Sequence, residues 1–158
     1  MSRISDILTG VQTAIEANAS FTTTLATVLR RGEIKQDTQY EDLRIFVDVG
    51  NPEPATGTPY AADCRIYPVE VVIKFTNEER INDNSDDADA VNVLKGTYSD
   101  AMKTAMRTCN QWSTYPISHV YFIIMKSENL NYKEPEEIED RSKRNFAIQQ
   151  IWNFFTYE

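Results

Sequence analysis

The segment from Asn145 to Glu158 carries apolar or aromatic side chains at both alternating sets of positions. Successive side chains of a strand point to opposite faces, so a strand with one solvated face alternates between apolar and polar residues. This segment therefore predicts a strand that is contacted on both faces by a helix, another sheet or a neighbouring copy. One set holds Phe146, Ile148, Trp152 and Phe154, and the other holds Ala147, Ile151, Phe155 and Tyr157.

Upstream segments also predict strands. Apolar side chains alternate with mostly polar ones in Asp42–Gly50 and in Arg65–Thr76, which is typical of strands with one buried face. The run His119–Ser127 is apolar through most of its length. Pro68 lacks a backbone N–H, so we expect its part of the strand to lie at a sheet edge or a bulge. Phe21–Arg31 fits either a helical face or a strand, and its β-branched residues favour the strand.

Two segments have the three- and four-residue apolar spacing of amphipathic helices. The first lies near the N-terminus, where Ser2 or Ser5 is a suitable N-cap and Asn18 a suitable end. The second runs from about Asp86 to Asn110, with acidic residues in its first turn and basic residues near its end, as the helix dipole favours. The apolar positions are Ile4, Ile7, Leu8, Val11 and Ile15 in the first, and Val91, Leu94, Tyr98, Ala101, Met102, Ala105 and Cys109 in the second.

These elements predict one α+β domain over residues 1–158. Its mostly antiparallel sheet carries a short N-terminal helix, one long helix packed on a sheet face and a C-terminal β-hairpin. A length of 158 residues permits one well-formed core and is short for two domains. Gly96 lies inside the long helix, where glycine costs about 1 kcal/mol relative to alanine. We therefore expect another backbone to press close to Gly96, or the helix to bend there.

The charge balance excludes some classes of partner. A net charge of -8 disfavours tight binding to nucleic acid phosphates, although an acidic wall would let DNA slide past without sticking. The first residues, Met1–Gly10, lack the features of a targeting signal, so we expect the protein in the cytoplasm. The longest apolar run, Val120–Met125, is too short to span a bilayer. Cys64 and Cys109 lie far apart, and we interpret both as packed thiols.

Motifs for catalysis or metal binding are missing from the sequence. His119 is the only histidine, and no HExxH, Walker or GxGxxG motif occurs. The acidic run that starts at Asp83 resembles a calcium loop, but Ala88 occupies the sixth position in place of glycine and Leu94 the twelfth in place of glutamate. A helix start capped by Ser85 explains the same residues. We therefore predict no enzyme activity, no metal and no cofactor.

Two connections are longer than a compact fold needs, since hairpin loops usually take about two to five residues. They are Gly50–Asp63 and Ser127–Arg144, and we interpret them, with the acidic turn Asn77–Asp89, as surfaces that contact neighbouring subunits or partners. Solvated surface loops are the alternative interpretation. Tyrosines in connections, among them Tyr115, are further candidates because tyrosine is favoured at interfaces. The candidate contact residues are Asn51, Glu53, Tyr60, Asn77, Glu78, Glu79, Arg80, Asp83, Tyr132, Glu136, Glu137, Arg141 and Arg144.

The order of the predicted elements along the chain allows a comparison with known families. An N-terminal helix is followed by the strands Leu43–Val49 and Arg65–Phe75, an acidic turn that opens a long helix, and a closing hairpin. The acidic and basic loop Asp140–Arg144 precedes a strand that finishes in Phe155–Glu158. This order resembles the tail terminator, or tail completion, proteins of long-tailed bacteriophages. The resemblance covers nearly the whole chain and lies in the pattern of elements, with few identical residues.

The resemblance implies a structural viral protein rather than an enzyme. It implies a homo-hexameric ring that caps the phage tail tube, ends tail polymerisation and forms the head–tail joining surface. Such a ring is assembled in the host cytoplasm and resides in the neck region of the virion. Its implied partners are the tail tube protein and a neck or head completion protein, while DNA passes through without specific binding. The alternatives are a head completion or neck connector protein, and a cytoplasmic ligand- or peptide-binding module that uses the sheet face beside Tyr67 and Trp152.

Overall fold

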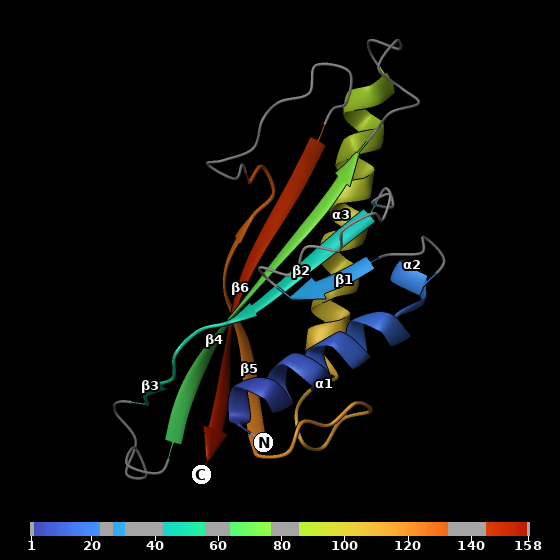
Figure 1. Ribbon diagram of the computed structural model, residues 1–158. Helices are drawn as coiled ribbons and strands as arrows, with labels where there is room; N and C mark the ends of the chain where they lie inside the picture. Colours follow the sequence, from blue (N-terminus) through green and yellow to red (C-terminus); the bar gives the residue numbers. More distant parts are fainter. Residues whose placement is uncertain are drawn as a thin grey trace.

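The computed structural model describes residues 2–22, 27–30, 43–55, 64–76, 86–132 and 145–157. The fold is α+β, as predicted, with a mainly antiparallel sheet and both longer helices on one of its faces (Figure 1). The elements are α1 (Arg3–Ala17), α2 (Ala19–Thr22), β1 (Thr27–Arg30), β2 (Leu43–Val49), β3 (Glu53–Pro54), β4 (Cys64–Thr76), α3 (Asp86–Arg107), β5 (Val120–Asn129) and β6 (Asn145–Tyr157).

The strand order in the sheet is β1-β2-β4-β6-β5, and β3 pairs with β4 beyond the end of β2. All neighbours are antiparallel except β1 and β2, which are parallel. The two longest strands, β4 and β6, pair along their whole length from Cys64↔Tyr157 to Thr76↔Asn145. The last two strands are antiparallel neighbours, as the predicted C-terminal hairpin requires, and β5 lies at the edge of the described sheet.

The hydrophobic core lies between one face of the sheet and the helices α1 and α3. The alternating residues predicted for β2 and β4 point to this face, and Ile45, Val71 and Ile73 are each 0% exposed. From β6 the same face receives Trp152 and Phe154. Among the described elements, α1 and α3 contact β6 on this face only, and the expected contact of its other face, for which a neighbouring copy was one alternative, stays a prediction.

The N-terminal helix begins and ends as its sequence predicts. Ser2 is the N-cap and accepts a hydrogen bond from the Ser5 backbone N–H at 3.3 Å, and Asn18 is the C-cap. The buried stripe is centred on Ile7 and Val11 and continues through Ala14 and Ile15, whereas Ile4 and Leu8 are only partly buried. The buried side of the helix is therefore rotated slightly from the side that the apolar spacing predicts.

The described residues of Phe21–Arg31 belong to two different elements. Thr27–Arg30 is strand β1, but Phe21 lies in the short helix α2. Asn18 turns the chain there, because its side-chain carbonyl accepts from the Ser20 N–H at 3.0 Å and its backbone carbonyl from the Phe21 N–H at 3.1 Å. The Phe21 ring then packs against Tyr98 of α3, with centroids 6.3 Å apart. Tertiary packing thus outweighs the strand preference at Phe21.

Pro68 and Gly96 occupy environments that the sequence predicted only in part. Pro68 lies in the central strand β4, but it faces the break between β2 and β3, where Gly50 donates to its carbonyl at 2.8 Å. A missing N–H is tolerated there because the neighbouring strand is interrupted. At Gly96 the first of the two expectations, a close backbone contact, is wrong, since a Cβ there would meet no neighbouring atom within 4 Å, and the second, a bend of the helix, stays a prediction.

Candidate functional site

The sheet face opposite the helices, here called the open face, carries an exposed apolar patch at one end. Phe122 is 49% exposed and Ile124 47% exposed, whereas the neighbouring Ile123 packs on the core. Apolar clusters on a surface commonly mark sites of protein interaction. The residues of this patch, called the apolar strip, are Ile66, Tyr121, Phe122, Ile124, Ile151, Phe155 and Tyr157, and strand pairing brings them together from β4, β6 and β5.

Aromatic rings give the apolar strip a defined shape. The centroids of Phe122 and Phe155 are 5.4 Å apart, and Tyr121 contacts both Phe155 at 6.3 Å and Tyr157 at 6.1 Å. The β5–β6 register shifts between Val120 and Phe122, so Tyr121 and Phe122 both lie close to Phe155. This bulge concentrates aromatic surface at one corner of the sheet, which favours contact with another protein.

The other end of the open face carries polar side chains beside the buried Val72 and Ala147. Gln149 donates a hydrogen bond to Glu70 at 2.7 Å, and the ammonium group of Lys74 lies 5.4 Å from the centre of the Phe46 ring. Lys74 is only 8% exposed, so its charge is held against the sheet. The open face is therefore divided into an apolar end beside β5 and a polar end beside β2.

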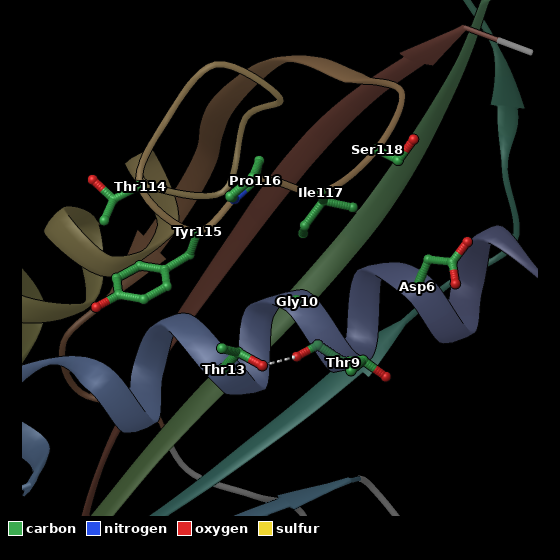
Figure 2. Close-up of a pocket in the computed structure, with 9 residues that line it drawn as sticks. All are labelled: Asp6, Thr9, Gly10, Thr13, Thr114, Tyr115, Pro116, Ile117 and Ser118. Atoms are coloured by element: carbon green, nitrogen blue, oxygen red, sulfur yellow. Dashed lines mark hydrogen bonds between the residues drawn. The ribbon is translucent and has the colours of Figure 1, made fainter.

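A groove of about 500 Å³ lies between α1 and the loop that follows α3 (Figure 2). Gly10 makes this arrangement possible, because a Cβ there would collide with the Ile117 side chain. Figure 2 places Tyr115 and Asp6 toward opposite ends of the groove. Its lining combines hydroxyl groups with one carboxylate, that of Asp6, and includes no histidine or cysteine. The lining residues are Asp6, Thr9, Gly10, Thr13, Thr114, Tyr115, Pro116, Ile117 and Ser118.

A second groove, of about 320 Å³, lies between α3 and the edge strand β5. We call it the α3–β5 groove. Its apolar lining is Ile123, Ile124, Met125 and Trp152, and its basic lining is Lys103 and Arg107. Lys103 and Arg107 lie one turn apart on α3, so both cations border the same apolar surface.

Beside this groove, a network of polar side chains connects α3 to the strands β5 and β6. Glu128 accepts hydrogen bonds from Ser99 at 2.5 Å and from Gln150 at 2.7 Å, and its carboxylate lies 3.4 Å from the Lys103 ammonium. Gln150 is 0% exposed and also accepts from the Trp152 indole at 3.0 Å. Burial opposes ionisation of Glu128, but the hydrogen bonds and Lys103 outweigh it, so the pKa of Glu128 is lowered.

The two cysteines and the single histidine of the chain line neither of these grooves. Both cysteines are free and buried, as predicted, and burial raises the pKa of Cys109 to about 12, so its thiol stays protonated. His119 precedes β5 with φ at 70° and contacts the Tyr157 ring at 5.2 Å. Among the described residues, no group of three or more His, Cys, Asp or Glu side chains is placed to hold a metal ion.

The predicted contact residues do not converge where the structure describes them. Asn51 and Glu53 are exposed beside the start of β4, where Glu53 pairs with Ile66. Tyr132 lies at the opposite end of the sheet and donates its backbone N–H to Ala147 at 3.1 Å. The other predicted positions lie outside the described residues: Tyr60, Asn77, Glu78, Glu79, Arg80, Asp83, Glu136, Glu137, Arg141, Arg144 and the proposed cap Ser85.

Two features of the surface were not predicted from the sequence. The exposed strip residues Phe122 and Ile124 lie in a run that reads as a buried strand, and they are exposed because they lie on the open face of an edge strand. Conversely, the sheet face beside Tyr67 and Trp152, suggested as a ligand site, is the helix-covered face, where these side chains are 4% and 2% exposed. Tyr115 borders the groove between α1 and the loop after α3, and its contact with a partner stays a prediction.

Comparison with known proteins gives no family: no protein-family model and no curated protein matches the chain. None of the helices in the described ranges combines the length and apolar character needed to cross a membrane. The function must therefore be inferred from the surfaces described above.

Proposed function

We propose that this protein is a structural assembly protein that caps a bacteriophage tail tube as a ring. The observation that carries the proposal is the apolar strip, which places exposed aromatic and aliphatic side chains beside the edge strand β5. Exposed apolar surface and an edge strand together form a site for another protein chain. A ring then follows if this surface meets a different surface on the next copy.

The charge of the chain supports a role in a DNA conduit. With a net charge of -8 per copy, a ring presents an acidic surface that repels DNA phosphates and does not retain the duplex as it passes. The element order of the chain, which resembles that of tail terminators, supports the same assignment. In this proposal the ring stops tube polymerisation, joins the tail to a neck or head completion protein, and resides in the virion.

Imaging and tube binding test the proposal directly. Negative-stain imaging of the purified chain, alone and with purified tail tubes, should reveal rings and capped tubes. Phe122→Asp should abolish both, because it places a charge in the apolar strip, while the 49% exposure of Phe122 limits the cost to folding to about 1–2 kcal/mol. Val93→Asp is the matched control, because Val93 is 66% exposed on α3. A chain that stays monomeric and does not bind tail tubes would refute the assignment.

A second candidate function is a ligand- or peptide-binding module. The groove between α1 and the loop after α3 favours it, since about 500 Å³ lies within the range of small-molecule pockets. Thermal-shift screening against metabolites and peptides tests this candidate. Saturable stabilisation of a monomer, weakened by Thr13→Trp in the groove, would favour the module over the ring. Binding to purified heads in place of tails would instead indicate a head completion or neck protein.

A further inference from the structure

The loop that joins α3 to β5 presents one large aromatic side chain to solvent. Trp112 is 74% exposed, the largest exposed fraction of any large apolar side chain among the described residues. Its backbone N–H donates to the Asn110 side chain at 3.0 Å, and the Gln111 N–H donates to the Val120 carbonyl at 2.7 Å. Because these bonds hold the loop in place, burying the indole ring costs less entropy than it would on a mobile segment. An exposed tryptophan on such a loop is typical of residues that dominate binding between proteins.

A site that fits an indole ring lies on the same loop. Residues 114–118 form one wall of the groove of about 500 Å³ against α1 (Figure 2). The groove offers apolar surface at Pro116 and Ile117 and a carboxylate at Asp6. The Asp6 side chain is half-buried and forms no hydrogen bond or ion pair with any residue that the structure describes. Since an indole ring has an apolar body and a single N–H donor, its chemistry is complementary to this lining.

The closeness of the ring and the groove indicates which occupant the groove receives. Trp112 is not part of the lining of its own groove, and only Ser113 separates it from the lining residue Thr114. One patch therefore contains both a protruding ring and a site that fits it. A two-fold contact buries the same patch of both copies and so requires a self-complementary patch, whereas a ring contact requires two different patches. This arrangement favours a second copy of the chain, related by a two-fold axis.

We propose that two copies associate about a two-fold axis, with Trp112 of each copy inserted into the groove between α1 and the loop after α3 of the other copy. The indole ring packs against Pro116 and Ile117, and its N–H donates to the Asp6 carboxylate. The contact uses no residue of the apolar strip. The inference therefore goes beyond the proposed ring and does not rest on it.

Sedimentation velocity of the full chain and two variants tests this contact. Trp112→Ala and the groove-filling Thr13→Phe should each weaken dimerisation at least about thirtyfold, because each removes both contacts of the dimer. An equimolar mixture of the two variants should form heterodimers of intermediate affinity, because one of the two contacts is then intact. Val93→Ala and Thr104→Phe, at exposed positions of α3, are the controls and should dimerise as the wild type does. Thr104 matches Thr13 because both hydroxyl groups donate to the carbonyl four residues earlier.

Tryptophan fluorescence provides a second measurement at the same site. The chain has two tryptophans, and Trp152 is only 2% exposed, so quenching by acrylamide reports mainly on Trp112. Quenching should decrease as the concentration rises through the range of dimerisation. Thr13→Phe adds no tryptophan and should abolish this dependence on concentration.

Other outcomes would overturn the contact. A chain in which acrylamide quenches Trp112 equally at all concentrations, or dimers that persist in both variants, would overturn it. Saturable binding of a metabolite in the groove of a monomeric chain would also overturn it and favour the ligand-binding module. The dimer should persist in Phe122→Asp, and its loss there would mean that the copies meet through the apolar strip instead. Capped tail tubes that form normally with Trp112→Ala would leave the tail-capping proposal intact, so the two proposals can fail separately.

Discussion

Both faces of the sheet carry large apolar side chains, but these side chains differ in their exposure to water. On the helix-covered face, Phe154 and Trp152 are 0% and 2% exposed, because α1 and α3 pack over them. On the open face, Phe122 and Ile124 are 49% and 47% exposed. An apolar residue stabilises the monomer only where the chain supplies a neighbour to exclude water. The apolar strip therefore contributes less to the stability of the monomer than the helix-covered face does, and we propose that it stabilises an assembly.

Replacing a phenylalanine by alanine on each face of β6 should give the largest difference in stability between the two faces. Phe154→Ala should lower the free energy of unfolding by about 3–5 kcal/mol, because it empties a well-packed core site. Phe155→Ala on the open face should cost less than half as much, since its ring is only partly buried in the monomer. Urea denaturation of the two variants measures both values. Equal losses would mean that the open face is as well packed as the core, which would contradict the comparison.

Removing the polar link beneath α3 should have the next largest effect. Gln150 is 0% exposed and joins Glu128, the Ser99 carbonyl and the Trp152 indole. Gln150→Leu should lower the free energy of unfolding by about 1–3 kcal/mol, because buried polar groups lose their partners. Gln149→Leu, the neighbouring change on the open face, is the control and should cost less. Denaturation of both variants decides whether α3 is held mainly by this network or by apolar packing alone.

Two helical glycines should respond to alanine in opposite directions. Gly10→Ala should destabilise the protein by about 1–3 kcal/mol, because the new methyl group collides with Ile117 and separates α1 from the loop after α3. Gly96→Ala should stabilise it by up to about 1 kcal/mol, because the position is open and alanine favours the helix. Thermal denaturation measures both shifts. Destabilisation by Gly96→Ala would reveal a close neighbour that the described residues do not supply.

The dependence of folding stability on the ionisation of Glu128 should be the smallest effect. Its pKa is lowered in the folded protein, so its contribution to stability is present above the unfolded value of 4.5 and is lost as pH falls through the folded pKa. Between pH 7 and pH 3 the wild type should therefore lose more stability than Glu128→Gln. Asp48→Asn, an exposed change on β2, is the control and should follow the wild type. If stability changes with pH in the same way in all three proteins, the ionisation of Glu128 does not contribute to stability.

Much of the fold could be predicted from the sequence because the patterns involved are local. Alternation in β2 and β4 identified their buried residues, since successive strand side chains must point to opposite faces. Ser2 and Asn18 marked the ends of α1 because their side chains suit the unsatisfied backbone groups of helix termini. The α+β class and the antiparallel hairpin of β5 and β6 followed from the order of these elements. None of these predictions needed knowledge of contacts between distant residues.

The surfaces could not be predicted because they depend on which elements become neighbours. The strand order β1-β2-β4-β6-β5 places β5 at an edge of the described sheet, and the helices pack on one face only, so Phe122 and Ile124 on the other face are exposed. The same packing brings Arg107 of α3 beside Ile123 and Met125. A period of two assigns side chains to the faces of a strand, but it carries no information about what covers those faces. The sequence by itself determined which residues are apolar and how each element orients them, and the tertiary structure decided which of them face water, because burial requires a partner from elsewhere in the chain.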